Sequence, residues 1–287
     1  MSAPLALLVE EELSQPVDPR VTELAASIAA KHGAASRAVL FYGSCLREKL
    51  LAGLMLDFYL IVSDYRAAYG KAWLARANAL VPPNVFPFEH DGLAAKYAVL
   101  SEADFHRLNG PETRNVSVWA RFAQPARLVW ARDAKASAKA VAAVARAAPT
   151  LLAAAGPIDG EEPLDWWRRA FALTYSAELR AERKARSGSV VDSDRDRYLR
   201  FSGPATAAIE AGSVSGGWAR RRIEGKLLSV VRLAKASATF AGGVDYIAWK
   251  INRHAGTDIV IKPWQRKHPL LAAISLLPRL LRSGAVR

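Results

Sequence analysis

The sequence predicts an α+β fold, in which a mixed β-sheet with flanking helices precedes a mainly helical region and a basic C-terminal helical segment. Two observations lead to this expectation. Residues 37–62 contain two apolar runs separated by a polar loop, as two adjacent buried strands require. Farther along, residues 131–155 are rich in alanine and residues 163–183 repeat their apolar positions every 3.6 residues, which indicates helices.

The first hundred residues alternate between the two kinds of element. Residues 21–31 predict an amphipathic helix that ends at Gly33, the position where a C′ glycine closes a helix. After the strand, loop and strand of residues 37–62, a second helix is expected between residues 65 and 80, because Pro82 and Pro83 follow it. Residues 92–101 predict another strand.

Glycines and serines cluster around residue 210, just before the charge balance of the chain changes, so a boundary is expected there. The alanine-rich helix would connect the sheet to the helical region. The expected organisation is an α+β domain at residues 1–133, a helical domain, with a winged helix as one form it could take, at 134–215, and a basic C-terminal segment at 216–287.

Composition excludes several classes of protein. About half of the 287 residues are apolar, which favours a folded globular chain over a disordered one. Cys45 is the single cysteine, so neither a disulfide framework nor a cysteine zinc site is expected. The first residues lack the basic region of a secretory signal, and no run approaches the roughly 18 apolar residues of a membrane-spanning helix.

Positive charge is concentrated at the C-terminal end. Residues 1–100 contain nine basic and ten acidic residues, a net of −1, whereas residues 217–287 contain 14 basic and three acidic residues, a net of +11. This asymmetry indicates an anionic partner: a lipid headgroup surface, a nucleic acid or a polyphosphate substrate.

The chemistry of the chain is indicated by Gly43 and Ser44, which are followed by Asp57 near the start of the next strand. A glycine without Cβ lets the backbone approach phosphates closely, and a serine hydroxyl and nearby amides supply donors. A carboxylate such as that of Asp57 binds magnesium. The pattern resembles the active-site signature of nucleotidyltransferases.

That signature has a second carboxylate two residues after the first, and here the position is Tyr59. Two magnesium ions usually need more than one carboxylate. The second metal ligand is therefore expected from Asp64, from Glu178 or from the triphosphate itself.

Several segments together resemble one branch, the mitochondrial-type CTP:phosphatidate cytidylyltransferases, peripheral membrane enzymes that make CDP-diacylglycerol. That family also has an apolar residue where Tyr59 stands. The similar segments occur in the family's order: FYGSC, LMLDFYLIVSDY, GLAAKYAVLSEADF, WARFAQP, LTYSAELR and, more loosely, SVVRLAKASATFAGG with Arg232 and Lys235.

The resemblance implies a nucleotidyltransferase fold and a magnesium-dependent reaction of CTP with phosphatidate. It implies that Asp57, Lys96 and Arg180 are catalytic and that Asp57 and Asp64 bind the metal. The nucleotide-binding residues that it implies are Tyr42, Gly43, Ser44, Lys96, Arg121, Tyr175 and Glu178.

The last 22 residues predict a helix that lies in a membrane interface. Apolar residues recur there at helical spacing with basic residues beside them, which places the apolar face among acyl chains and the cations at lipid phosphates. The predicted contacts are Lys267, Leu270, Ile274, Leu277, Arg279, Leu281 and Arg282. A helix packed on the protein's own core is the alternative.

Together these features predict a peripheral enzyme on the cytoplasmic side of a membrane, and they leave a homo-oligomer open. Two other hypotheses about the function stay open as well. One is a soluble nucleotidyltransferase that modifies a small molecule or a protein. The other is a non-catalytic basic protein that binds nucleic acid, which the lack of a groove-reading motif disfavours.

Overall fold

A five-stranded mixed sheet forms the centre of the computed structural model, which describes residues 4–48, 51, 54–178, 190–209, 216–239 and 260–267. The strand order is β3-β4-β2-β1-β5, in which β2 and β4 pair in parallel and the other pairs are antiparallel. The strands are β1 (Ser36–Tyr42), β2 (Met55–Val62), β3 (Asn84–His90), β4 (Leu93–Ser101) and β5 (Ala126–Ala131).

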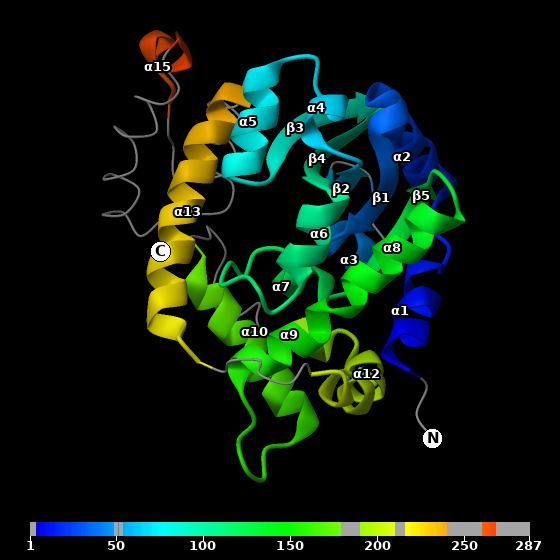
Figure 1. Ribbon diagram of the computed structural model, residues 1–287, viewed down its shortest axis with the longest axis vertical. Helices are drawn as coiled ribbons and strands as arrows, with labels where there is room; N and C mark the ends of the chain where they lie inside the picture. The colour runs from blue at the N-terminus through cyan, green and yellow to red at the C-terminus, as the bar shows by residue number, and fades with distance from the viewer. Residues whose placement is uncertain are drawn as a thin grey trace.

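Helices surround the sheet, and those from α7 to α12 gather below it in Figure 1. In the N-terminal half they are α1 (Leu5–Leu13), α2 (Pro19–Lys31), the 3₁₀ helix η1 (Gly33–Ala35), α3 (Ser44–Glu48), α4 (Tyr65–Ala68), α5 (Ala72–Leu80), α6 (Glu102–Asn109) and α7 (Trp119–Phe122). The others are α8 (Ala134–Ala145), α9 (Ala147–Ala155), α10 (Pro163–Ala177), α12 (Arg195–Ala207), α13 (Trp218–Thr239) and α15 (Pro263–Lys267).

The predicted α+β class is confirmed, and most local expectations are met within a few residues. The helix at residues 21–31 is α2, which Asp18 caps and after which Gly33 takes a positive φ of 51°. The expected helix at residues 65–80 is two shorter helices, α4 and α5. The alanine-rich region likewise divides, because Ala131 ends a strand and Arg146 separates α8 from α9.

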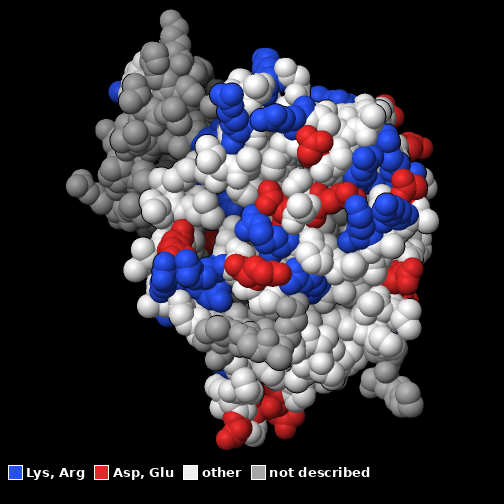
Figure 2. Space-filling model, in the orientation of Figure 1, with Lys and Arg blue, Asp and Glu red and all other residues white. Residues whose placement is uncertain are grey.

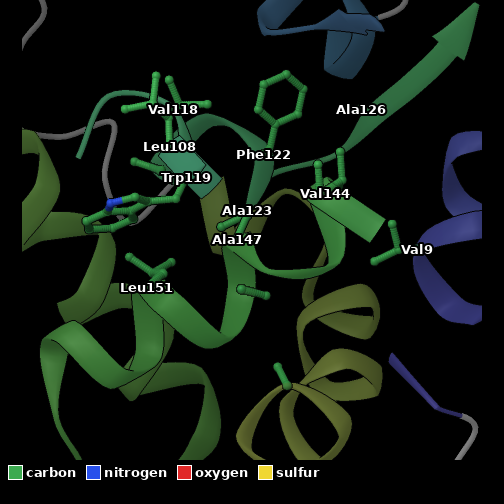
Figure 3. Close-up of a cluster of buried hydrophobic side chains, with 14 of the residues drawn as sticks. Val9, Leu108, Val118, Trp119, Phe122, Ala123, Ala126, Val144, Ala147 and Leu151 are labelled. Atoms are coloured by element: carbon green, nitrogen blue, oxygen red, sulfur yellow. The ribbon is translucent and has the colours of Figure 1, made fainter. Parts of the chain in front are cut away.

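The sheet separates two apolar cores, because side chains of a strand alternate between its faces. Tyr59 and Ile61 of β2 belong to the larger core, together with residues of α1, α6 to α10 and α12. Phe58 and Leu60 belong to the smaller core, which α2 covers. Figure 3 shows part of the larger core, where Trp119 and Phe122 of α7 lie among side chains from α6, α8 and α9.

The larger core joins parts of the chain that the sequence assigns to different domains. Tyr59, from the predicted first domain, and Trp167, from the predicted second domain, are both buried in it. The predicted domain boundaries stay predictions, but the sheet and the helices are packed through one continuous set of apolar side chains.

One helical stretch in the described part of the chain, Ala134–Ala155, is long and apolar enough to cross a membrane by length and composition. Because it is mostly buried, it is not a clear membrane span. The stretch comprises α8 and α9, and 56% of its apolar window is buried inside the protein. Its apolar residues, such as Val144 and Leu151, contribute to the larger core.

His32 is held neutral beside the smaller core. Its Nδ1 lies 3.0 Å from the carbonyl oxygen of Ala68, and its Nε2 lies 3.1 Å from the hydroxyl of Tyr97. A carbonyl oxygen can only accept, so Nδ1 carries the proton and Nε2 accepts from Tyr97. Burial lowers the pKa of His32, because the charged form loses its water.

We expect His32 to make the fold less stable in mild acid. As the pH falls through the unfolded pKa of about 6.5 towards the lowered folded pKa, the unfolded chain takes up a proton that the folded chain resists, so the free energy of unfolding falls. The test is urea unfolding at pH values about one unit above and below 6.5. The free energy of unfolding should differ less between the two pH values in His32→Leu than in the wild type. His106→Leu, at an exposed position, is the control. If the free energy of unfolding of His32→Leu depends on pH as strongly as that of the wild type, the prediction is wrong.

Candidate active site

Asp57 lies between two neighbouring strands near the start of β2. It pairs with Tyr42 of β1 on one side and with Lys96 of β4 on the other. The Nζ atom of Lys96 is 3.0 Å from Oδ1 of Asp57, and the two side chains are 23% and 22% exposed. Strand pairing therefore fixes a carboxylate and an ammonium group side by side where a ligand can still reach them.

Gly43 brings the backbone against this carboxylate. It has a positive φ of 97°, which side chains with a Cβ rarely permit. A Cβ placed on Gly43 would lie only 3.2 Å from Oδ2 of Asp57. Ser44 follows as the first residue of α3 and is partly exposed. The structure therefore brings together the glycine, the serine and the aspartate that the sequence predicts.

Two tyrosines lie beside Asp57 on the same side of the sheet. The rings of Tyr42 and Tyr59 are 5.3 Å apart, and Tyr59 packs edge-on to Phe122 at 5.2 Å. Burial raises the pKa of both hydroxyls, and the negative charge of Asp57 raises them further. Both tyrosines stay protonated near neutral pH, so they can donate hydrogen bonds but do not act as bases.

Arg121 and Glu178 form an ion pair next to these tyrosines. Arg121 is on α7 and Glu178 follows the last residue of α10; the closest nitrogen and oxygen are 3.7 Å apart. Burial alone would lower the pKa of Arg121, but Glu178 and the two tyrosines outweigh it and the net shift is upward. Arg121 therefore remains charged, and about 30% of its side chain is exposed.

Two basic residues of α13 lie next, Arg232 near Tyr59 and Lys235 beside Arg232. Arg232 donates from Nη1 to the hydroxyl of Ser117 at 2.8 Å and from Nε to the carbonyl of Pro82 at 2.9 Å. Lys235 donates from Nζ to the carbonyls of Val81 and Pro83, the latter at 2.8 Å. Burial, together with the nearby charge of Arg232, lowers the pKa of Lys235 to about 7.

The sequence alone did not assign Arg232 and Lys235 to the site. They match only loosely in the family resemblance, and their spacing on a basic helix equally suits a solvated face. The described side chains that meet around Tyr59 and Asp57 include three cations and two carboxylates: Lys96, Arg121, Arg232, Asp57 and Glu178. A site with this balance attracts anions.

Asp64 does not belong to this site, and its predicted role as a metal ligand beside Asp57 is corrected. It follows the far end of β2, where its carboxylate accepts from the backbone amides of Arg66 and Ala67 and caps α4. The part of β2 from Asp57 to its end at Val62 alone corresponds to about 17 Å, and Asp64 lies beyond it.

Of the remaining predicted residues, Tyr175 and Lys267 lie in the described part of the chain and the others lie outside it. Tyr175 lies on α10 one turn before Glu178 and packs partly buried against the larger core. Lys267 is the last residue of α15. Arg180 and the predicted membrane contacts Leu270, Ile274, Leu277, Arg279, Leu281 and Arg282 lie outside the described residues.

The donor set suits a magnesium ion that a nucleotide completes. No group of three or more His, Cys, Asp or Glu side chains able to hold a metal occurs among the residues that the structure describes. Asp57 offers one partly exposed carboxylate, and Glu178 is already paired with Arg121. Magnesium is commonly bound through one or two carboxylates plus substrate phosphates, so Asp57 fits such a site once phosphates are present.

No protein-family model and no curated protein matches this chain. The function is therefore inferred from the arrangement of Gly43, Asp57, Lys96 and the surrounding cations.

The position of Glu178 depends on a close crossing of two helices. A Cβ added to Gly225 of α13 would overlap the carbonyl oxygen of Ala177, the residue before Glu178. A glycine is needed there because the backbones of α10 and α13 leave no room for a methyl group.

We expect Gly225→Ala to destabilise the protein by about 1–3 kcal/mol, since the helices must separate. Gly203→Ala, in α12, is the matched control: nothing lies within 4 Å of its added Cβ, and alanine favours a helix over glycine by about 0.5–1 kcal/mol. Thermal and urea unfolding of the two variants measure both effects. Equal stability of Gly225→Ala and the wild type would contradict the close crossing.

Proposed function

We propose that this protein is a magnesium-dependent cytidylyltransferase that transfers the cytidylyl group of CTP to phosphatidate at a membrane surface, which gives CDP-diacylglycerol and pyrophosphate. The observation that supports nucleotidyl transfer is the contact of the Gly43 backbone with the Asp57 carboxylate, beside Lys96. The choice of CTP and phosphatidate comes from the family resemblance of the sequence.

The triphosphate would lie against Gly43 and Ser44, where the lack of a Cβ admits phosphate oxygens to the backbone. Lys96 would pair with a phosphate as well as with Asp57, since its side chain is partly exposed. Arg121 would contribute a second charged donor from α7.

Asp57 would hold the magnesium ion, which neutralises charge on the triphosphate when it is bound. Asp57 is the single acid of the described site that is accessible and not paired with an arginine. The triphosphate would supply the other ligands of the ion.

In the reaction, an oxygen of the acceptor phosphate attacks the α-phosphorus of CTP in line and the bond to pyrophosphate breaks. The acceptor phosphate is already ionised near neutral pH, so no residue needs to remove a proton. This agrees with two tyrosines that stay protonated beside Asp57. The chain contributes orientation and fixed positive charge, which stabilise the negative charge of the transition state.

Asp57→Asn should lower the rate by at least about a hundred-fold, the scale found when a group that stabilises transition-state charge is removed. The assay is pyrophosphate release by purified protein with CTP, magnesium and phosphatidate in detergent. Asp64→Asn is the control: asparagine also caps helices, and Asp64 lies far from Asp57, so its rate should equal that of the wild type. Equal rates for Asp57→Asn and the wild type, or none in either, would refute the function.

The described part of the basic C-terminal region offers one surface that suits a membrane. On α13 the side chains of Ile223, Leu227 and Val231 recur every four residues and are 70%, 64% and 39% exposed. Arg222 and Lys226 are exposed beside them, and basic side chains gather near the start of α13 in Figure 2. An apolar stripe bordered by cations is the composition of a helix that binds anionic lipid surfaces.

Leu227→Glu should weaken binding to vesicles of phosphatidylcholine and phosphatidate by at least about ten-fold, because it removes buried apolar area and adds a negative charge. Leu199→Glu, at a half-exposed position of α12, is the control. Vesicle flotation measures both. Binding that survives Leu227→Glu would remove α13 from the membrane contact. If the wild type binds no vesicles but transfers a nucleotide in detergent, the hypothesis of a soluble nucleotidyltransferase is correct.

A further inference from the structure

The loop before α7 is held along its length by α13. Nη1 of Arg221 donates to the carbonyl of Arg114 at 3.0 Å, and Glu224 forms an ion pair with the Arg114 side chain at 3.2 Å. Farther along the helix, Arg232 donates to the hydroxyl of Ser117 at 2.8 Å. Three side chains of one helix therefore fix the loop, although the two segments are about a hundred residues apart in sequence.

Ser117 connects this attachment to the active site. Its hydroxyl accepts from Arg232, and its carbonyl oxygen accepts from Nη1 of Arg121. Its own backbone amide donates to Oδ1 of Asn115 at 3.0 Å, which holds the residue within the loop. One residue thus lies between the two guanidinium groups and contacts both.

The nitrogens of Arg232 are directed at protein atoms. Nε and Nη2 both donate to the carbonyl of Pro82, and Nη1 donates to Ser117. Burial lowers the pKa of Arg232, and Tyr59 and Glu178 oppose that shift. Arg232 therefore joins the turn before β3 to the loop before α7.

We propose that Arg232 is a positioning residue, which fixes Ser117 and thereby sets the direction in which Arg121 presents its guanidinium group. The importance of Arg121 for the reaction rests on the proposed function, whereas the effect of Arg232 on Arg121 does not. A lysine at position 232 keeps the charge but has a single nitrogen, which cannot hold Pro82 and Ser117 with the geometry of a guanidinium fork.

The kinetic test uses Arg232→Lys, Ser117→Ala and the double variant. Each single change should lower kcat/KM for CTP by about ten- to a hundred-fold, because small misplacements of a binding group are costly. The double variant should lose no more than the worse single variant, since both act on the same contact. Arg195→Lys, at an exposed position of α12, is the control. Additive losses, or full activity in Arg232→Lys, would overturn the proposal.

A second readout does not depend on activity. The side-chain Nε–H resonance of Arg121, assigned by its loss in Arg121→Lys, should shift or broaden in Arg232→Lys and in Ser117→Ala and stay unchanged in Arg195→Lys. An unchanged resonance together with lost activity would mean that Arg232 contacts the substrate directly, and the proposal would be wrong. If the resonance shifts while the wild type transfers no nucleotide, the proposed function fails and the positioning role stands.

Discussion

The approach of the Gly43 backbone to the Asp57 carboxylate is the constraint on which the site depends. Any Cβ at position 43 would lie 3.2 Å from Oδ2, and the φ of 97° disfavours residues other than glycine independently. The pairing of β1 with β2 places this glycine, and the parallel pairing of β2 with β4 places Lys96 in register on the other side. A carboxylate, an ammonium group and open backbone therefore meet at one point of a rigid sheet.

The contribution of α13 to the site has a different physical basis. Arg232 lies near Tyr59, Lys235 lies beside Arg232, and both donate to backbone carbonyls of residues 81–83. Carbonyl oxygens satisfy the donors but do not cancel the formal charge of the cations. Burial of such charge costs free energy, which is reflected in the lowered pKa of Lys235, and an incoming anion would recover part of that cost. Arg121, whose pKa is raised, supplies positive charge before a ligand arrives.

The sequence could predict the parts of the site that depend on short-range pattern. Gly43 and Asp57 lie at the facing ends of two apolar runs, so pairing of those runs as adjacent strands brings them together. Asp64 is closer to Asp57 in sequence than Gly43 is, but β2 carries it past the far end of the strand, where it caps α4. Arg232 could not be predicted from pattern, because only the packing of α13 against the turn at residues 81–83 shows that it is partly buried.

The positive charge around position 59 explains why a tyrosine suits that position better than a second carboxylate. Position 59 faces the same side of the sheet as Asp57, and Arg121, Arg232 and Glu178 all influence the pKa of its hydroxyl. A second carboxylate there would neutralise one of these arginines and repel an approaching phosphate. A protonated tyrosine occupies the same position and leaves the positive charge available. The site would then hold its metal through Asp57 and the substrate phosphates, and it would use its arginines for the anionic groups that react.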